Sequence, residues 1–329
     1  SSAKSYQKLF YCEIEKAVIE MRNLFDILPV YGMEHDAILS KMGDVTVAFK
    51  VELPELFTMS NDDYEAFHHA WIKAIKVLPV NSVLCKQDWF TETKYKAGFQ
   101  NEDNSFLSRS SERFFNERPY LDHSCYIMLT KKPANRKLSS SVFSSLLRKS
   151  IVPEETLQPK HFHDFMNHVG QFEKILSDSG FISFKKLDNT ALFELLIQYL
   201  NLQSDDTTVR DIEFKDNWKI GENHCQLYTI ADAEFVPALC GSRINYDKYS
   251  TDKTKFSVGF ASPIGQLLNC NHIYSQYVFI EDVQKAMQKL ESKRLRLQSL
   301  SAYSRENFIS KESTDAFLNE AISEQRLPV

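Results

Sequence analysis

The sequence predicts an α+β fold, with mainly antiparallel sheet layers that resemble ferredoxin-like units and a helical insertion between them. Two observations predict this class. Stretches with the two-residue alternation of strands, such as residues 45–53, are bounded by turn residues. Other stretches, such as residues 64–78, carry apolar side chains at the three- and four-residue spacing of amphipathic helices. Residues 34–131 have the order β-β-α-β-α-β, and because sequential strands usually pair in one sheet, we expect the two helices of this segment to cover one of its faces.

The stretch 34–79 predicts a β-hairpin followed by a helix. Gly43 lies between two alternating runs and can adopt a positive φ in the turn without steric cost. Ser60 fits the N-cap of the helix, and Asp63, three residues later, completes a capping box. Pro79 ends the helix. The apolar faces of these elements are expected to bury each other.

The same two periodicities place the other elements along the chain, with Pro and Gly residues between them. The predicted strands are residues 37–40, 45–53, 81–90, 123–130, 182–187, 212–220, 224–231, 256–261 and 273–280. The predicted helices are residues 4–24, 60–78, 105–117, 157–179, 190–202, 281–302 and 314–325, the last of them opened by Ser313.

Changes in composition divide the chain into five expected segments. A run rich in Ser and basic residues separates the first group of strands from a helical block. The segments are an N-terminal helix and lead-in (1–33), a first α+β subdomain (34–131), the Ser-rich and basic linker (132–155), the helical block (156–208) and a second α+β subdomain (209–329).

The composition is that of an ordinary globular protein. The 329 residues are 43% hydrophobic and 25% charged, and the formal net charge of −5 argues against a whole surface that holds nucleic acid. The six cysteines are scattered without a CxxC pair, so we expect free thiols in a reducing compartment. No apolar run approaches the roughly 18 residues that span a bilayer, and the first residues lack the apolar stretch of a secretory signal. We therefore expect a cytoplasmic protein.

The motif scan predicts no nucleotide site and no catalytic residue. A phosphate-binding loop needs the pattern GxxxxGK[ST], and the nine glycines never supply it. Gly259 and Gly265 have the required spacing, but Gln266 stands in the place of the lysine. The patterns GxGxxG, GxSxG and HExxH and the EF-hand loop are also absent from the sequence.

Two sets of residues were considered as metal sites. His161, Asp164 and His168 lie at spacings of three and four and can share a helix face, but spacing fixes no fourth ligand, so we favour a solvated face. A second set combines histidines and cysteines from the last third of the chain. The spacing of these residues matches no zinc module, so we favour buried free cysteines over a zinc site. Its members are His224, Cys225, Cys240, Cys270 and His272.

Two segments are candidate partner-binding surfaces. The loop 241–255 is long and combines rigid aromatic side chains with charge, as partner surfaces do; an ordinary surface loop is the alternative. The predicted helix 281–302 is basic over residues 285–296 and could bind nucleic acid or an anionic membrane surface. The alternative is that these basic side chains are simply exposed to solvent. The candidate residues are Arg243, Tyr246, Lys248 and Tyr249 in the loop, and Lys285, Lys289, Lys293, Arg294 and Arg296 in the helix.

Several stretches resemble the amino-terminal region of the TraG family of conjugation ATPases, which are proteins of conjugative transposons related to the ATPase of type IV secretion. The resemblance runs from about residue 21 to residue 329 and leaves residues 1–20 outside it. It is carried by residues 34–79, by KQDWFTETKYKAGF (86–99) and by the stretches 105–133, 223–280 and 291–307.

The resemblance implies a docking role without catalysis. Family members carry their Walker motifs, and hence ATP and Mg²⁺, in a carboxy-terminal RecA-like domain. Nothing in these residues matches those motifs, so we expect this chain to be the amino-terminal domain alone, without a cofactor. Its expected partners are inner-membrane components of the secretion system and neighbouring subunits of the ATPase ring, which would hold it at the inner membrane. The alternatives are a nucleic-acid-binding domain in conjugative DNA transfer and an enzyme with an unrecognised metal site.

Overall fold

The chain has an α+β fold, as the sequence predicts. The computed structural model describes residues 28–54, 59–95, 105–134, 158–201, 210–214, 218–230, 268–300 and 304–323. The expected helix at 4–24, the loop 241–255, the strand at 256–261 and most of the linker 132–155 lie outside these residues.

Seven of the described strands form one sheet, and all of their pairings are antiparallel. The strands follow the order β1 (Val30–Glu34), β2 (Ala37–Ser40), β3 (Val45–Glu52), β5 (Pro119–Lys131), β4 (Ser82–Lys94) and β10 (His272–Phe279), while β6 (Ser183–Lys186) pairs with the end of β3. Three short strands form a second sheet: β7 (Ile212–Phe214), β8 (Trp218–Ile220) and β9 (Asn223–Cys225).

Two tight turns connect the first three strands. Gly43 has a φ of 84°, which confirms the glycine turn between β2 and β3. Strand β1 was not predicted, because the Pro29–Gly32 region was interpreted only as the break after a helix. His35 and Asp36, at φ values of 54° and 56°, give the turn before β2 the two positive φ values of a type I′ hairpin.

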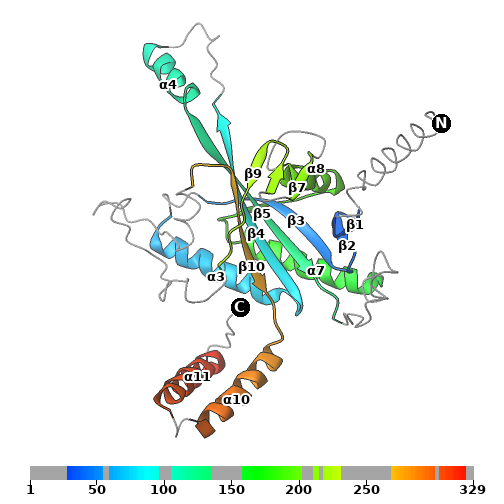
Figure 1. Ribbon diagram of the computed structural model, residues 1–329, viewed down its shortest axis with the longest axis vertical. Helices are drawn as coiled ribbons and strands as arrows, with labels where there is room; N and C mark the ends of the chain where they lie inside the picture. Colours follow the sequence, from blue (N-terminus) through cyan, green and yellow to red (C-terminus); the bar gives the residue numbers. More distant parts are fainter. Residues whose placement is uncertain are drawn as a thin grey trace, which may run out of the picture.

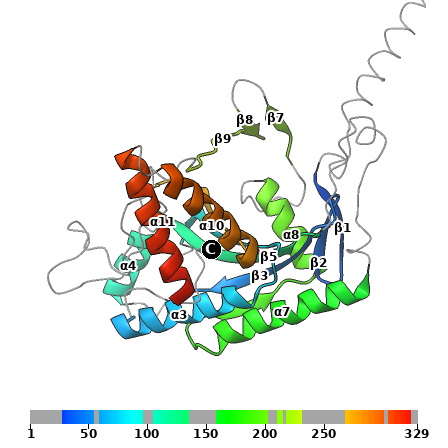
Figure 2. The same ribbon diagram turned by 90° about the horizontal axis from the view of Figure 1, so that it is seen from below.

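Helices cover both faces of the sheet (Figure 2). On one face, α3 (Asn61–Val77) and α7 (Pro159–Ser177) bury side chains such as Ala74 and Phe172 against Phe49 and Ile127 of the strands. On the other face, α8 (Asn189–Leu200) packs Leu192 and its neighbours against a smaller cluster around Trp89. The prediction of helices on one face concerned residues 60–78 and 105–117: α3 does cover one face, whereas the second of these helices has no buried residue. The sheet forms the middle of a three-layer core.

The capping box at the start of α3 is confirmed. The backbone N–H of Asp63 donates to Ser60 Oγ at 3.2 Å, and the backbone N–H of Ser60 donates to Asp63 Oδ2 at 3.1 Å. These two bonds satisfy donors that would otherwise be unpaired at the helix start.

The second α+β subdomain was expected to begin at residue 209, but β10 from that segment lies beside β4 of the first. Eight consecutive pairs, from His272–Phe90 to Phe279–Val83, join them. The predicted strand 212–220 is instead two short strands, β7 and β8, which pair antiparallel. The predicted strand 224–231 is limited to β9 in the described residues.

Two parts of the chain project from the sheet at opposite ends of the long axis (Figure 1). Strands β4 and β5 extend beyond their neighbours and carry α4 (Phe106–Asn116) at their end. At the other end, α10 (Val283–Leu300) and α11 (Arg305–Ser323) pack against each other. Helix α11 begins nine residues before the predicted start at residue 314, with Ser304 Oγ accepting from the backbone N–H of Glu306 at 3.2 Å. None of the described helices is long and apolar enough to cross a membrane.

Candidate functional site

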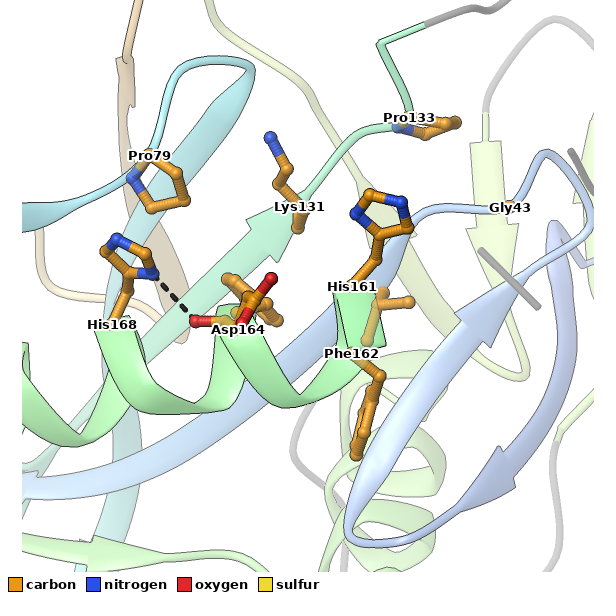
Figure 3. A pocket seen from close by; sticks show the side chains of 10 residues that line it. Gly43, Pro79, Lys131, Pro133, His161, Phe162, Asp164 and His168 are labelled. Carbon is orange, nitrogen blue, oxygen red and sulfur yellow. Dashed lines mark hydrogen bonds between the residues drawn. The ribbon is translucent and has the colours of Figure 1, made fainter. Parts of the chain in front are cut away.

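The histidines of α7 line a cavity of about 220 Å³ between the helix and the edge of the sheet (Figure 3). His161, Asp164 and His168 are on one wall, as their spacing predicts, and Lys131 of β5 is on the other. Apolar and proline side chains complete the lining: Val45, Pro79, Pro133, Phe162 and Phe165.

This cavity lacks the geometry of a metal site. His168 Nδ1 lies 2.7 Å from the backbone carbonyl oxygen of Asp164 and donates to it, so only Nε2 of this ring is available to a metal. Lys131 brings a positive charge to the opposite wall and donates to the backbone carbonyl of Val80. Among the residues that the structure describes, no three His, Cys, Asp or Glu side chains are grouped to hold a metal ion.

The second set of candidate ligands is divided among separate elements. His224 and Cys225 belong to β9 of the small sheet, whereas Cys270 and His272 lie at the start of β10 in the large sheet. Cys240 lies outside the described residues. His272 Nδ1 is bonded at 2.7 Å to the backbone carbonyl of Cys270. The described members form no metal-binding group.

A polar cluster that the sequence analysis missed lies on the face of the sheet. Asp88 of β4 is nearly buried and has two partners, Lys86 Nζ and, at 2.9 Å, His123 Nε2 of β5. Burial acts to raise the pKa of Asp88, but the hydrogen bonds and charges of His123 and Lys86 outweigh it and hold the pKa below its usual value. Asp88 therefore stays ionised at neutral pH and links two strands.

Cys125 lies beside Asp88, but the pair is unsuited to nucleophilic chemistry. Burial, opposed in part by Lys86 and reinforced by Asp88, raises the pKa of the Cys125 thiol to about 12. A thiol with this pKa remains protonated at neutral pH and is a weak nucleophile. We therefore interpret the cluster as a structural ion-pair network. The signal that could have revealed it is the polar run from Lys86 to Asp88, which interrupts the apolar residues of the strand between Cys85 and Trp89.

Four large apolar side chains are exposed on α4. Phe106 and Leu107 are 83% and 78% exposed, Phe114 and Phe115 are 50% and 54% exposed, and the helix has no buried residue. The last four pairs of the supporting ribbon, from Thr91–Asp122 to Lys94–Pro119, have no third strand beside them among the described residues. We call residues 91–95 and 105–122 the arm.

The charged side chains of α4 and of the two residues that follow it are engaged within the chain. Arg113 Nε donates to Glu117 Oε1 at 2.8 Å, and the Arg118 guanidinium lies 3.6 Å from the centre of the Phe114 ring. Arg109 and Glu112 also have partners. The hydrogen bond and the charge of Arg113 lower the pKa of Glu117. Helix α4 therefore offers to solvent an apolar, aromatic surface with little unpaired charge.

The basic residues of α10 divide into two groups. Lys285, Lys289, Lys293 and Arg296 are exposed, whereas Arg294 faces α11 and its Nη1 lies 3.9 Å from Asp315 Oδ1. Of the other candidate residues, Arg243, Tyr246, Lys248 and Tyr249 lie outside the residues that the structure describes.

Comparison with known families gives one match. Residues 17–69 match a family model described as "Domain of unknown function, B. Theta Gene description" (DUF3875). The matched range includes β1, β2, β3 and the first turns of α3, and the description carries no function. None of the curated proteins matches the chain.

Proposed function

We propose that this chain is the amino-terminal assembly and docking domain of a TraG-type conjugation ATPase that powers type IV secretion. In this proposal the chain binds inner-membrane components of the secretion system or neighbouring subunits, and it is cytoplasmic and held at the inner membrane by those partners. ATP and Mg²⁺ belong to the RecA-like domain of such an ATPase. The resemblance of the sequence to that family supports the proposal.

The arm is the single observation that carries the docking role. Four large apolar side chains of α4 are exposed at the end of a two-stranded ribbon, far from the core that could have buried them. Clustered exposed apolar residues of this kind mark interaction sites, and Phe side chains are common at the centres of interfaces. Because the charges of α4 are engaged within the chain, an apolar groove on a protein is the complementary partner.

The test compares conjugative transfer by cells that carry the full-length protein with and without changes in the arm. Phe106→Ser together with Phe114→Ser removes two of the four exposed apolar side chains of α4 while Arg113 and Glu117 remain. We expect transfer to fall at least tenfold, since each central apolar residue contributes at least about 1.4 kcal/mol, a factor of ten, at a well-packed interface. ATP hydrolysis by the purified protein should be unchanged.

A matched control changes exposed aromatic residues elsewhere. Tyr31→Ser with Phe193→Ser removes two side chains that are 60% and 45% exposed on other elements, and it should leave transfer intact. Normal transfer with the arm variant, or an equal loss with the control, would contradict the docking role of the arm. Loss of ATP hydrolysis in the arm variant would contradict the assignment of docking without catalysis.

A further inference from the structure

Four cations form a straight stripe along α10. Lys285, Lys289, Lys293 and Arg296 follow one another at spacings of four, four and three residues, so they lie on one side of the helix over about 16 Å. All four are exposed. The less exposed side chains of α10, such as Leu290 and Leu297, lie on the other side of the helix. Arg294 also lies on that side and forms an ion pair with Asp315 of α11. The stripe therefore points away from α11.

The positive charge of this stripe is largely uncompensated. Lys285 Nζ lies 3.4 Å from Asp282 Oδ2, the carboxylate that also accepts from the backbone N–H of Gln284 at the helix start. No ion pair involves Lys289, Lys293 or Arg296 within the part of the chain that the structure describes. The flanking side chains are uncharged: Gln288, Ser292 and Ser299.

The rest of the molecule does not explain the stripe. The chain carries a net charge of −5, so a run of unpaired cations on one projecting helix is a local departure from the overall charge. No large apolar side chain lies between the four cations on their face of the helix, and Leu300, 42% exposed, follows Arg296 one turn later on the same side. A membrane-binding helix and a protein interface both need apolar anchors among their charges, and none lies among these four.

We propose that the α10 stripe binds the phosphate backbone of double-stranded DNA without reading its sequence. Regularly spaced cations neutralise phosphates and release counterions, which supplies essentially all of the free energy of non-specific DNA binding. The stripe offers up to four such contacts and no group suited to reading bases. This site is separate from the arm and does not depend on the docking role proposed above.

The experiment measures fluorescence anisotropy of a labelled 20-base-pair duplex of arbitrary sequence with the purified chain, between 50 and 200 mM NaCl. Four phosphate contacts give a slope of about −3.6 for log K against log salt, so the affinity should fall by about 150-fold over this range. In the variant K289Q/K293Q/R296Q one contact remains, and the fall should be only about threefold.

A control variant of equal net charge separates the stripe from general electrostatics. K73Q/K76Q/K174Q removes three exposed lysines from α3 and α7, and it should keep the steep salt dependence. The proposal is overturned if the duplex does not bind at 50 mM NaCl or if both variants weaken binding equally. Binding to vesicles of phosphatidylglycerol and phosphatidylcholine but not to the duplex would also overturn it. Circular dichroism confirms that each variant is folded.

Discussion

His123 Nε2 donates a hydrogen bond to Asp88 Oδ1 across strands β4 and β5, at 2.9 Å. Because the Asp88 carboxylate is ionised and can only accept, the donor must be the histidine nitrogen. On the same face, the ring of Phe90 lies between His123 and His272, with centroids 4.9 and 4.5 Å away. Polar and aromatic contacts thus join three strands next to the base of the arm.

The Asp88 cluster predicts a specific pH dependence of stability. The folded-state pKa of Asp88 is lowered, so its contribution is complete above the usual carboxyl pKa of about 3.9 and is lost as the pH falls through the folded value. Asp88→Asn should lower the free energy of unfolding by about 2 kcal/mol at pH 7, because Lys86 and His123 then face a neutral amide with one accepting oxygen in place of a carboxylate with two. The difference from the unmodified chain should shrink below about pH 4.

Urea unfolding followed by circular dichroism at pH 7 and at pH 3.5 checks this prediction. Asp164→Asn is the matched control, because Asp164 is exposed and no ion pair of its carboxylate is found among the described residues. It should follow the stability of the unmodified chain at both pH values. A constant deficit for Asp88→Asn across this range would mean that ionisation of Asp88 does not contribute.

Two phenylalanines on helices should differ sharply in their effect on stability. Phe172 of α7 is fully buried against the sheet, and Phe172→Ala should cost about 3–5 kcal/mol through lost contacts and a cavity. Phe106 of α4 is exposed, and Phe106→Ala should change stability by less than about 0.5 kcal/mol. Chemical denaturation of the two variants measures the contrast. A large loss for Phe106→Ala would show that α4 packs on the chain itself.

The described cysteines should differ in reactivity. Burial raises the pKa of Cys85 to about 11 and that of Cys125 to about 12, whereas Cys270 is exposed. Iodoacetamide at pH 7.5 should therefore modify Cys270 in the folded chain and reach Cys85 and Cys125 only after unfolding. Peptide mass spectrometry identifies the modified sites. Rapid alkylation of Cys125 in the folded chain would contradict the buried position of its thiol.

The capping box of α3 predicts that loss of the Ser60 side chain lowers the stability of the protein moderately. Ser60→Ala removes the acceptor for the backbone N–H of Asp63 and should lower the free energy of unfolding by about 1 kcal/mol. Ser177→Ala, at the last residue of α7, serves as a control and should have little effect. Thermal unfolding of the two variants gives the comparison. Equal melting temperatures would indicate that the cap does not contribute to the folded state.

Sequence patterns within a few residues were sufficient to predict turns, helix caps and amphipathic helices. The glycine turn, the capping box and the apolar stripe of α7 depend on residues within a few positions of one another, and all three are confirmed. The sequence does not predict strand β1, because the strand is short and contains Gly32, a residue that is rare in strands. Its extended conformation is stabilised by pairing with β2.

Long-range relations could not be predicted from the same patterns. An amphipathic period gives α4 an apolar face but does not say whether another element covers it, and here none of the described elements does. Asp88 and His123 meet only because β4 and β5 pair in one register. The pairing of β10 with β4 could be seen only in the structure, because a local sequence pattern does not indicate which strand is the partner.

The place of β10 beside β4 has a consequence for synthesis on the ribosome. Strands β3, β4 and β5 emerge early and can pair, but the outer edge of β4 stays open until the much later residues of β10 have been translated. During that interval β4 presents a row of unpaired backbone groups, which is the usual template for aggregation. A nascent chain that stalls before residue 272 should therefore depend on chaperones far more than the complete sheet does.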